Sequence, residues 1–318
     1  MNPSFISDAD IAKLLDYESV AEVLDQAYQD FGAGRASVHP RTRSECANAR
    51  LSSMGGIWTG RGVAAVKVYP TMAGRFSFLV NLFDLDTNTA LAVLEGNELT
   101  RFRTAAQTAL IARKVVPAGA SKLALFGAGL QGRAQADALC GVFRFQEIAV
   151  VDPLCDEDWC RQLAQRTGAS VHACLAEEAV RGADVVVTAT RSTEPVFLGH
   201  WLKPRAFVAA IGISAPKGRE LDDATLDRAS RVIVEWLPQS MEEAGDIVLW
   251  NASQATKLDK TLDLPTLYGG LAPWPSSGSC ITVFKSVGTG LADTACAYLA
   301  YQRSHASERM SERWEVCA

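Results

Sequence analysis

The stretch that most restricts the fold of this chain is KLALFGAGLQGRAQADAL. Five residues typical of a buried strand come first, then Gly127, Gly129 and Gly132 in G-x-G-x-x-G spacing, then a helical pattern. In this context the first glycine permits a tight turn, the second lets a pyrophosphate approach the backbone, and the third lets helix and strand pack closely. The N–H groups that begin the helix, at Leu130 and Gln131, are expected to bind the phosphates of a dinucleotide.

The residue that ends the next predicted strand indicates which cofactor binds. Asp152 follows EIAVV, twenty residues after Gly132, where a carboxylate binds the ribose hydroxyls of adenosine. A carboxylate repels a 2′-phosphate, and PLCDEDWC adds three more acids before the first base, Arg161. We therefore favour NAD(H) and leave NADP(H) open. The alternative is a glycine-rich turn in an α/β protein that binds no cofactor.

Strand and helix patterns alternate over the middle of the chain, which predicts an α/β fold with a Rossmann-type, doubly wound parallel sheet over residues 118–288. The strand patterns are KLALF, EIAVVD, ADVVVTAT, FVAAIG, RVIVEW and CITVF. ADVVVTAT ends in Thr188, Ala189 and Thr190, at the carboxyl edge of the sheet where ligands bind. These three residues are candidates to line the nicotinamide side of the cofactor, with simple strand-end residues as the alternative.

The first part of the chain has a different pattern. Between residues 51 and 95 apolar segments alternate as in an antiparallel sheet, and DTNTA predicts a hairpin turn with Asn88 in a left-handed conformation. We expect an α+β domain over residues 1–117, completed by a C-terminal helix at 289–318. The edge of such a sheet is rarely left unpaired, so these strands are the expected interface of a homodimer.

The composition of the chain excludes several classes of function. The net charge is −5 over 318 residues, and no run of Lys or Arg is long enough to bind nucleic acid. No apolar run could span a membrane and the N-terminus has no signal pattern, so we expect a cytoplasmic protein. Eight cysteines form no C-x-x-C pair and only four histidines accompany them, which favours reduced thiols over disulfides or a metal site.

One charged residue interrupts a predicted buried strand. In VAAVKVYP, Lys67 is the one charge among mostly apolar neighbours. Burial of an ammonium group without a partner is costly, so a lysine in such a strand indicates a function. The alternative is that the alternation of the strand turns Lys67 to solvent.

Several segments together resemble the ornithine cyclodeaminase / mu-crystallin family in their order and spacing. The resemblance implies a Rossmann domain and an N-terminal domain for substrate binding and dimerisation, to which the C-terminal helix returns. It also implies a nicotinamide dinucleotide and a small imino or amino acid as ligands. The segments are HPRT, VAAVKVYP, LTRFRTAAQTAL, LFGAGLQGRAQ, ADVVVTAT, AIGISAPKGREL, EAGDI and ITVFKSVGTGLAD.

The resemblance implies that Arg41, Lys67 and Arg103 bind the substrate carboxylate. The role suits arginine, because a guanidinium group binds a carboxylate through two parallel hydrogen bonds. Arg43 could replace Arg41, and Arg103 could instead be a surface residue of its helix.

The resemblance also implies that FKSVG closes over the nicotinamide, which makes Ser286, Val287 and Gly288 candidate cofactor residues. A plain turn between strand and helix is the alternative. The family's usual Met-Pro-Ala near the substrate is MGG here. Gly55 and Gly56 are therefore expected to loosen or enlarge that wall of the substrate site.

The loop in AIGISAPKGREL decides which reaction the resemblance implies. Family members that cyclise ornithine with loss of ammonia carry an aspartate in this loop as a general base, and Ser214 stands at that position. A serine with no activating partner cannot act as a base near neutral pH, and losing a general base costs roughly 10²–10⁴ in rate. Asp222 and Asp223 follow nearby but have the pattern of residues that begin a helix.

We therefore expect an oxidoreductase on the mu-crystallin side of the family, an NAD(P)H-dependent reductase of cyclic ketimines. Its expected substrates are Δ1-pyrroline-2-carboxylate or Δ1-piperideine-2-carboxylate, reduced to L-proline or L-pipecolate, with Lys67 and Ser214 as catalytic residues. Three alternatives stay open: ornithine cyclodeaminase with a base from elsewhere, an amino-acid dehydrogenase like alanine dehydrogenase, and a non-catalytic binding protein like mu-crystallin.

Overall fold

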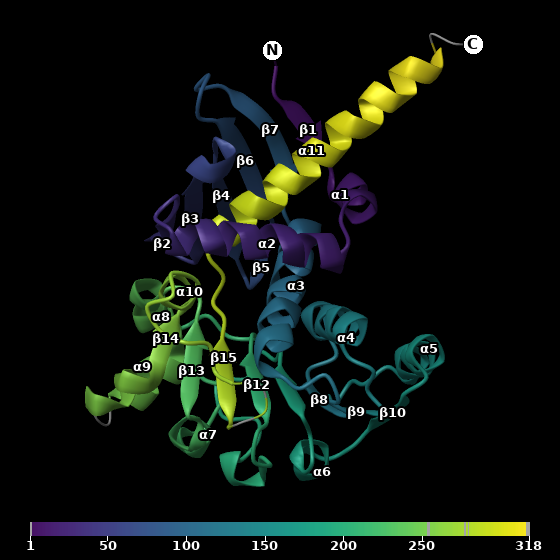
Figure 1. Cartoon of the computed structure of the whole chain (residues 1–318), viewed down its shortest axis with the longest axis vertical. Coiled ribbons are helices and arrows are strands. Elements are labelled where there is room, and N and C mark those ends of the chain that lie inside the picture. The colour runs from purple at the N-terminus through teal and green to yellow at the C-terminus, as the bar shows by residue number, and fades with distance from the viewer. Residues whose placement is uncertain (1, 253–254, 277, 279, 316–318) are drawn as a thin grey trace. The chain divides into compact units, whose positions relative to one another are not determined.

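The structure of the protein is a computed structural model that describes residues 2–252, 255–276, 278 and 280–315, with side chains for all of these except 255–257 and 307–315. The chain divides into two compact units (Figure 1). Unit 1 comprises Met1–Arg103 and Gly288–Ala318, and unit 2 comprises Thr104–Val287. The break between the units falls inside helix α3 (Asn97–Val115), and the domain boundary at residue 117 stays a prediction.

Unit 1 is built on a mostly antiparallel sheet with the strand order β1-β7-β6-β4-β3-β2 and with β5 paired to β4. Only the pair of β1 and β7 is parallel among the described strands of this sheet. The predicted turn joins β6 to β7, and Asn88 in it has a φ of 54°. The elements of unit 1 before α3 are β1 (Ser4–Ile6), α1 (Asp8–Leu14), α2 (Tyr17–Gly32), β2 (Ala36–Cys46), β3 (Ala49–Trp58), β4 (Val63–Met72), β5 (Arg75–Phe76), β6 (Leu79–Asp84) and β7 (Ala90–Glu95).

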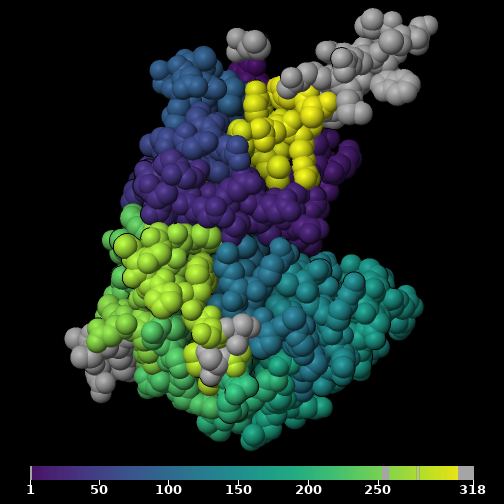
Figure 2. Space-filling model, viewed as in Figure 1, coloured from purple at the N-terminus to yellow at the C-terminus, as the bar shows by residue number. Residues whose placement is uncertain are grey.

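The last helix of the chain, α11 (Gly290–Glu315), packs on the first hundred residues. It contacts α1, α2 and five strands of the sheet, β2, β3, β4, β6 and β7. In Figure 2 the yellow atoms of α11 lie directly against purple atoms of the N-terminal segments. None of the helices in the described part of the chain is both long and apolar enough to cross a membrane.

Unit 2 contains an eight-stranded sheet with the order β10-β9-β8-β11-β12-β15-β13-β14, in which every described pair is parallel. This confirms the predicted α/β fold with a parallel sheet. The six predicted strands are β8 (Lys122–Phe126), β9 (Glu147–Val151), β11 (Val185–Thr188), β12 (Phe207–Ala210), β13 (Arg231–Val234) and β15 (Thr282–Lys285). The sequence analysis missed β10 (Ser170–Ala173) and β14 (Thr261–Asp263), which are short and lie at the two edges.

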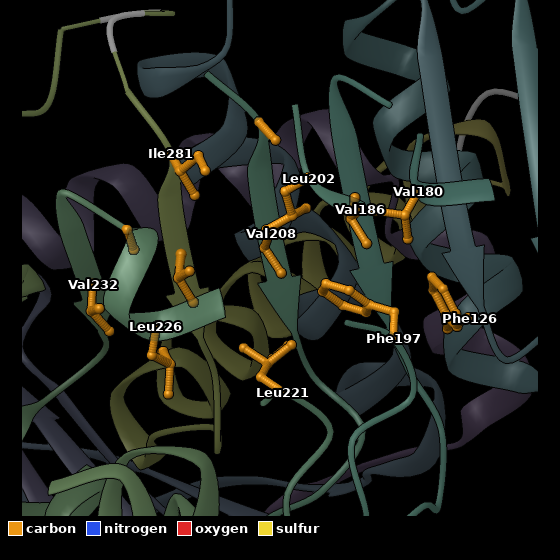
Figure 3. Close-up of a cluster of buried hydrophobic side chains, with 14 of the residues drawn as sticks. Phe126, Val180, Val186, Phe197, Leu202, Val208, Leu221, Leu226, Val232 and Ile281 are labelled. Atoms are coloured by element: carbon orange, nitrogen blue, oxygen red, sulfur yellow. The ribbon is translucent and has the colours of Figure 1, made fainter. Parts of the chain in front are cut away.

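Helices cover this sheet, as the buried faces of parallel strands require. Figure 3 shows the hydrophobic core on one face, where Phe126, Val186 and Val208 from three neighbouring strands lie around Phe197, and Leu226 lies near Val232. The rings of Phe126 and Phe197 have centroids 5.5 Å apart. The helices of unit 2 after α3 are α4 (Leu130–Val142), α5 (Glu157–Thr167), α6 (Ala176–Val180), α7 (Asp223–Arg228), α8 (Leu237–Glu243), α9 (Gly245–Asn251) and α10 (Leu264–Tyr268).

The order of strands creates a switch point in the sheet of unit 2. β8 and β11 lie side by side, β9 follows on the outer side of β8, and β12 follows on the outer side of β11. Ligands of doubly wound sheets bind at such a point, beyond the carboxyl ends of the strands. The glycine-rich loop after β8 and the segment after Thr188 therefore come together where a dinucleotide is expected.

Candidate functional site

Lys67 lies on the buried face of the unit 1 sheet. It belongs to a cross-strand row with Met54, Val80 and Leu94. Each residue of the row is at most 2% exposed. The alternation along β4 thus turns Lys67 into the core and not to solvent, so its ammonium group needs partners there.

Asp293, Arg103 and Thr100 contact this ammonium group or each other. Lys67 Nζ lies 3.1 Å from Asp293 Oδ1 and donates a hydrogen bond to Thr100 Oγ1. Arg103 Nε lies 3.3 Å from the same oxygen of Asp293. The ring of Phe78 has its centroid 4.0 Å from Lys67 Nζ, which adds a cation–π contact.

Arg41 belongs to the same neighbourhood. Its Nε donates a hydrogen bond of 3.4 Å to the sulfur of Met54, the cross-strand partner of Lys67. Arg41 is half-buried, whereas Arg43 is exposed. The structure therefore brings Arg41, Lys67 and Arg103 together and leaves Arg43 exposed, while their binding of a substrate carboxylate stays a prediction.

The environment of Lys67 changes its proton affinity. Burial lowers the pKa of Lys67 from 10.5 to about 8. The negative charge of Asp293 opposes this shift, while the positive charges of Arg103 and Arg41 add to it. Lys67 can therefore exchange its proton near neutral pH, as a general acid must.

The cluster combines charges of both signs. Arg41, Lys67 and Arg103 lie near one another, and Asp293 contacts two of them. Asp293 Oδ2 is buried and has no hydrogen-bond partner among the described residues. A ligand with an N–H group could satisfy this oxygen.

The sequence analysis assigned no role to Asp293. The signal was present, because the residue is an acid in the first turn of a helix whose other early residues are buried and mostly apolar. Burial of an unpaired carboxylate is as unfavourable as burial of the unpaired ammonium group of Lys67. The ion pair between the two residues offsets both costs.

Gly55 and Gly56 do not loosen the wall beside this cluster, so that expectation was wrong. A Cβ on Gly56 would lie 2.8 Å from the Cα of Leu291, and a Cβ on Gly290 would lie 2.0 Å from the carbonyl oxygen of Gly55. The backbone of α11 fills the space that larger side chains would occupy. These glycines let the first turn of α11, which carries Asp293, approach β3 closely.

The glycine-rich loop of unit 2 has the geometry that its spacing predicts. Gly127 has a φ of 89°, and a Cβ there would lie 2.7 Å from the carbonyl oxygen of Ala189. A Cβ on Gly132 would lie 1.7 Å from the carbonyl oxygen of Gly127. Gly129 is the N-cap of α4, with open space at its Cβ position and no capping side chain. The helix start is thus open to an anionic group, which fits the pyrophosphate of a dinucleotide.

Asp152 directly follows β9 and is bonded to this loop. Its Oδ2 accepts a hydrogen bond of 2.6 Å from the N–H of Ala128, and its Oδ1 accepts one of 2.8 Å from the N–H of Leu154. The carboxylate is half-buried and held in place. Its contact with the ribose of a cofactor stays a prediction.

Two threonines at the switch point have different surroundings. Thr188 is buried, and its hydroxyl has no partner among the described residues. The hydroxyl and the N–H of Thr190 both donate to Oε1 of Glu220, at 2.7 and 2.8 Å. A ligand would therefore satisfy the hydroxyl of Thr188. Thr190 instead connects the segment after β11 to Glu220, a buried acid for which no role was predicted.

The segment that was expected to close over the nicotinamide is held by another buried acid. Glu235 accepts a hydrogen bond of 2.7 Å from the Ser286 hydroxyl and one of 2.8 Å from the N–H of Val287. Gly288 belongs to unit 1, where a Cβ on it would lie 2.7 Å from Nη1 of Arg103. Contact of these residues with a cofactor stays a prediction.

Ser214 lies half-buried in the loop after β12, and the acids that follow it are engaged. Asp222 caps α7 by accepting a hydrogen bond of 2.8 Å from the N–H of Thr225, as predicted. Asp223 lies 2.6 Å from Arg219 in an ion pair. Both carboxylates are therefore engaged at the start of α7.

A buried ion pair braces this loop. Lys285 Nζ lies 2.8 Å from Asp246 Oδ2, with both side chains fully buried, and it donates to the carbonyl oxygen of Ile213 at 2.7 Å. Asp246 Oδ1 accepts from two successive backbone N–H groups at the other end of the loop. The segments EAGDI and ITVFKSVG thus fix the backbone on both sides of Ser214.

Comparison with known proteins places the chain among relatives of similar length. The model of the ornithine cyclodeaminase/mu-crystallin family matches residues 1–308. The ketimine reductase mu-crystallin of Mus musculus is 33% identical over 223 residues, which cover 70% of this chain and 68% of that one.

Two solved structures have the same fold over nearly the whole chain. The probable ornithine cyclodeaminase from Bordetella pertussis Tohama I is 40% identical with a TM-score of 0.92, covering 96% of this chain and 98% of that one. The Δ1-pyrroline-2-carboxylate reductase of Thermococcus litoralis, in complex with NADH and L-proline, is 25% identical with a TM-score of 0.88 and the same coverage. With the family model and both structures in agreement, the chain belongs to the ornithine cyclodeaminase/mu-crystallin family.

Proposed function

We propose that this protein reduces a cyclic ketimine that carries a carboxylate on the imine carbon, with NADH as the hydride donor. The observation that carries the proposal is the buried cluster of Lys67, Arg103 and Asp293, where an ammonium group with a lowered pKa lies beside a guanidinium group. Similarity to a ketimine reductase and to a Δ1-pyrroline-2-carboxylate reductase supports it. Δ1-Pyrroline-2-carboxylate is the first expected substrate, because the second relative binds L-proline.

Arg41 and Arg103 would bind the substrate carboxylate. A fixed guanidinium group binds a carboxylate through parallel hydrogen bonds and sets the orientation of the ring. Asp293 limits the movement of Arg103 through its contact of 3.3 Å with Nε. Much of the catalysis then comes from holding the imine carbon at the correct distance and angle.

Lys67 would supply the proton that the imine nitrogen gains. The N–H bond of the ammonium group breaks as the proton moves to the nitrogen, which makes the adjacent carbon a better hydride acceptor. Solvent returns a proton to the neutral amine afterwards. A pKa near 8 keeps Lys67 mostly protonated at neutral pH while it remains acidic enough to donate.

The cofactor would be held by unit 2. The backbone of the loop from Gly127 to Gly132 and the start of α4 would bind the pyrophosphate, Asp152 the adenosine ribose, and Thr188 the nicotinamide side. A bound NADH supplies the hydride. Ser214 would hydrogen-bond the substrate or an ordered water. Lys285 and Asp246 would keep its hydroxyl in position, because they hold both ends of its loop.

A panel of imines tests this proposal. The purified protein is mixed with NADH or NADPH and with Δ1-pyrroline-2-carboxylate, Δ1-piperideine-2-carboxylate or, as a matched control, Δ1-pyrroline without a carboxylate. We expect cofactor oxidation with the carboxylated imines and at least about 100-fold lower kcat/KM with the control. Equal rates with and without the carboxylate would contradict the role of the arginines, and no oxidation with any imine would contradict the function.

Ornithine cyclodeamination is the second candidate, because a probable ornithine cyclodeaminase is 40% identical to this chain. That reaction needs a base where this chain has Ser214. The nearby carboxylates of Asp222 and Asp223 are engaged in a helix cap and an ion pair. Release of ammonia from L-ornithine would favour this candidate over the reductase.

We further propose that the protein is a homodimer that pairs through the outer face of the unit 1 sheet. Ile57, Ala64 and Phe83 form a cross-strand row on the face opposite to Lys67. Several large apolar residues on this sheet are more than a third exposed, which is unusual for a monomer. They are Leu51, Ile57, Met72, Phe76, Leu79 and Phe83.

A further inference from the structure

The two cysteines closest to each other in the sequence are also in contact in the structure. Cys155 Sγ and Cys160 Sγ lie 3.3 Å apart. Cys155 is half-buried in the turn before α5, and Cys160 is buried in the first turn of that helix. The sequence analysis regarded all eight cysteines as scattered reduced thiols, and this contact distinguishes two of them.

The pair is connected to the cofactor loop by hydrogen bonds. The N–H of Cys155 donates to the carbonyl oxygen of Asp152 at 3.1 Å, and the carboxylate of Asp152 accepts from the N–H of Ala128 at 2.6 Å. The N–H of Cys160 donates to the carbonyl oxygen of Asp156 at 3.0 Å. A change at the two sulfurs therefore moves backbone that holds the candidate ribose-binding carboxylate.

A second connection runs through one arginine of α4. Arg133 Nη2 lies 3.1 Å from Asp156 Oδ2, and its Nε donates to the carbonyl oxygen of Ala128 at 2.9 Å. The same guanidinium group lies 5.0 Å from the ring centroid of Trp159. The segment from Cys155 to Cys160 and the loop after β8 are thus linked by two sets of contacts.

We propose that Cys155 and Cys160 form an oxidisable dithiol, which a hydroperoxide converts to a disulfide, and that the disulfide weakens dinucleotide binding at Asp152. The second part rests on the proposed function of unit 2 as the NADH site. Formation of the bond must bring the sulfurs from 3.3 Å to about 2.05 Å, so the Cys155 turn has to move.

The chemistry balances with a hydroperoxide as the oxidant. The Cys155 thiolate attacks one peroxide oxygen, the O–O bond breaks, and water or an alcohol leaves, which gives a sulfenic acid. Cys160 then attacks that sulfur, the S–O bond breaks, and the hydroxyl leaves as water with the thiol proton. The two sulfurs together lose two electrons, which reduce the peroxide. The half-buried Cys155 reacts first, because burial raises the pKa of Cys160 to about 12.

Peptide mapping tests the disulfide without reference to activity. The full-length protein is treated with hydrogen peroxide, alkylated and digested with trypsin, which leaves both cysteines in one peptide, Phe145–Arg161. A disulfide lowers the mass of this peptide by about 2 Da and removes two alkylation sites. We expect this product in the wild type and in Cys46→Ser, a control at an exposed thiol, but not in Cys155→Ser or Cys160→Ser. Failure of the pair to link under conditions that oxidise Cys46 would overturn the proposal.

NADH binding to the same samples tests the coupling. The Kd of the oxidised wild type should be at least about fivefold higher than that of the reduced protein and should recover with dithiothreitol. Both serine variants should be insensitive to peroxide. A disulfide with unchanged Kd would overturn the coupling. If the reduced protein does not bind NADH, the proposed cofactor site is wrong, and so is the coupling. The disulfide is tested separately, by the mass of the peptide.

Discussion

Lys67 Nζ lies 3.1 Å from Asp293 Oδ1, although 226 residues separate the two along the chain. Both side chains are at most 2% exposed. Removing one partner of such a buried pair leaves an uncompensated charge, which costs far more than removing both. The helix that ends the described chain thus takes part in a site whose lysine lies in the first quarter of the sequence.

Lys67→Met should remove turnover and keep cofactor binding. The substitution deletes the proton donor and one carboxylate contact, so we expect kcat for imine reduction to fall by about 10³ or more. The Kd for NADH, measured by fluorescence, should change less than about twofold, because the residues proposed to bind the pyrophosphate and the adenosine ribose lie in unit 2. A variant that keeps a tenth of the wild-type kcat would show that Lys67 is not the donor.

The pH profile of kcat reports the charge of Lys67. The proton must be present for donation, so kcat should fall as the pH rises through about 8. Asp293→Asn removes the negative charge that raises this pKa, and we expect the alkaline limb to move to lower pH by about one unit. If the alkaline limb of Asp293→Asn stays at the pH of the wild type, that limb does not report the titration of Lys67.

Lys67 also makes stability depend on pH. Its pKa is 10.5 in the unfolded chain and about 8 in the folded protein. Between these values the unfolded chain binds more protons, so the free energy of unfolding should gain a contribution that rises with pH in this window. Lys67→Met should flatten that rise in urea titrations from pH 8 to 10. An equal slope in both proteins would contradict the lowered pKa.

Asp152 should decide between the two nicotinamide cofactors. Asp152→Ser removes the charge that repels a 2′-phosphate and weakens the bonds to the ribose, so the ratio of kcat/KM for NADH over NADPH should fall by about tenfold or more. Asp158→Ser is a matched control, because that exposed acid pairs with Arg161 on the surface of α5. An equal effect of both substitutions would show that the net charge of the protein, and not a specific contact of Asp152, sets the preference for NADH.

The dimer proposal makes a prediction for the outer face of unit 1. Ile57→Glu and Phe83→Lys introduce charges into the apolar row, and either should convert a dimer of the wild type to a monomer in light scattering at micromolar concentration. Leu154→Glu, at an exposed apolar residue of unit 2, is the control and should leave the dimer intact. A wild type that is monomeric at these concentrations would contradict the interface.

The parallel sheet of unit 2 was predictable because its strands are continuous apolar segments bounded by turns. Gly127 and Gly132 also indicated their roles, since steric limits at these two positions exclude other side chains. Local patterns carry such information in a few consecutive residues. The edge strands β10 and β14 were missed because SVHA and TLD are not continuous apolar segments, and both strands are only partly buried.

The partners of the buried charges were not predictable from local patterns. Lys67 stood out as a charge in an apolar strand, but its partner Asp293 lies on a helix far along the chain. Glu235 and Asp246 likewise contact segments that tertiary packing alone brings near. The two glycines of MGG misled for the same reason, because α11 fills the space beside them.

The protein is proposed to reduce imines and not to deaminate ornithine. A paired assay tests this proposal most directly: one arm follows oxidation of NADH with Δ1-pyrroline-2-carboxylate, and the other measures ammonia and proline from L-ornithine and NAD⁺. We predict fast NADH oxidation in the first arm and no ammonia in the second. Ammonia and proline at a comparable rate would contradict the account, because they would require a base in place of Ser214.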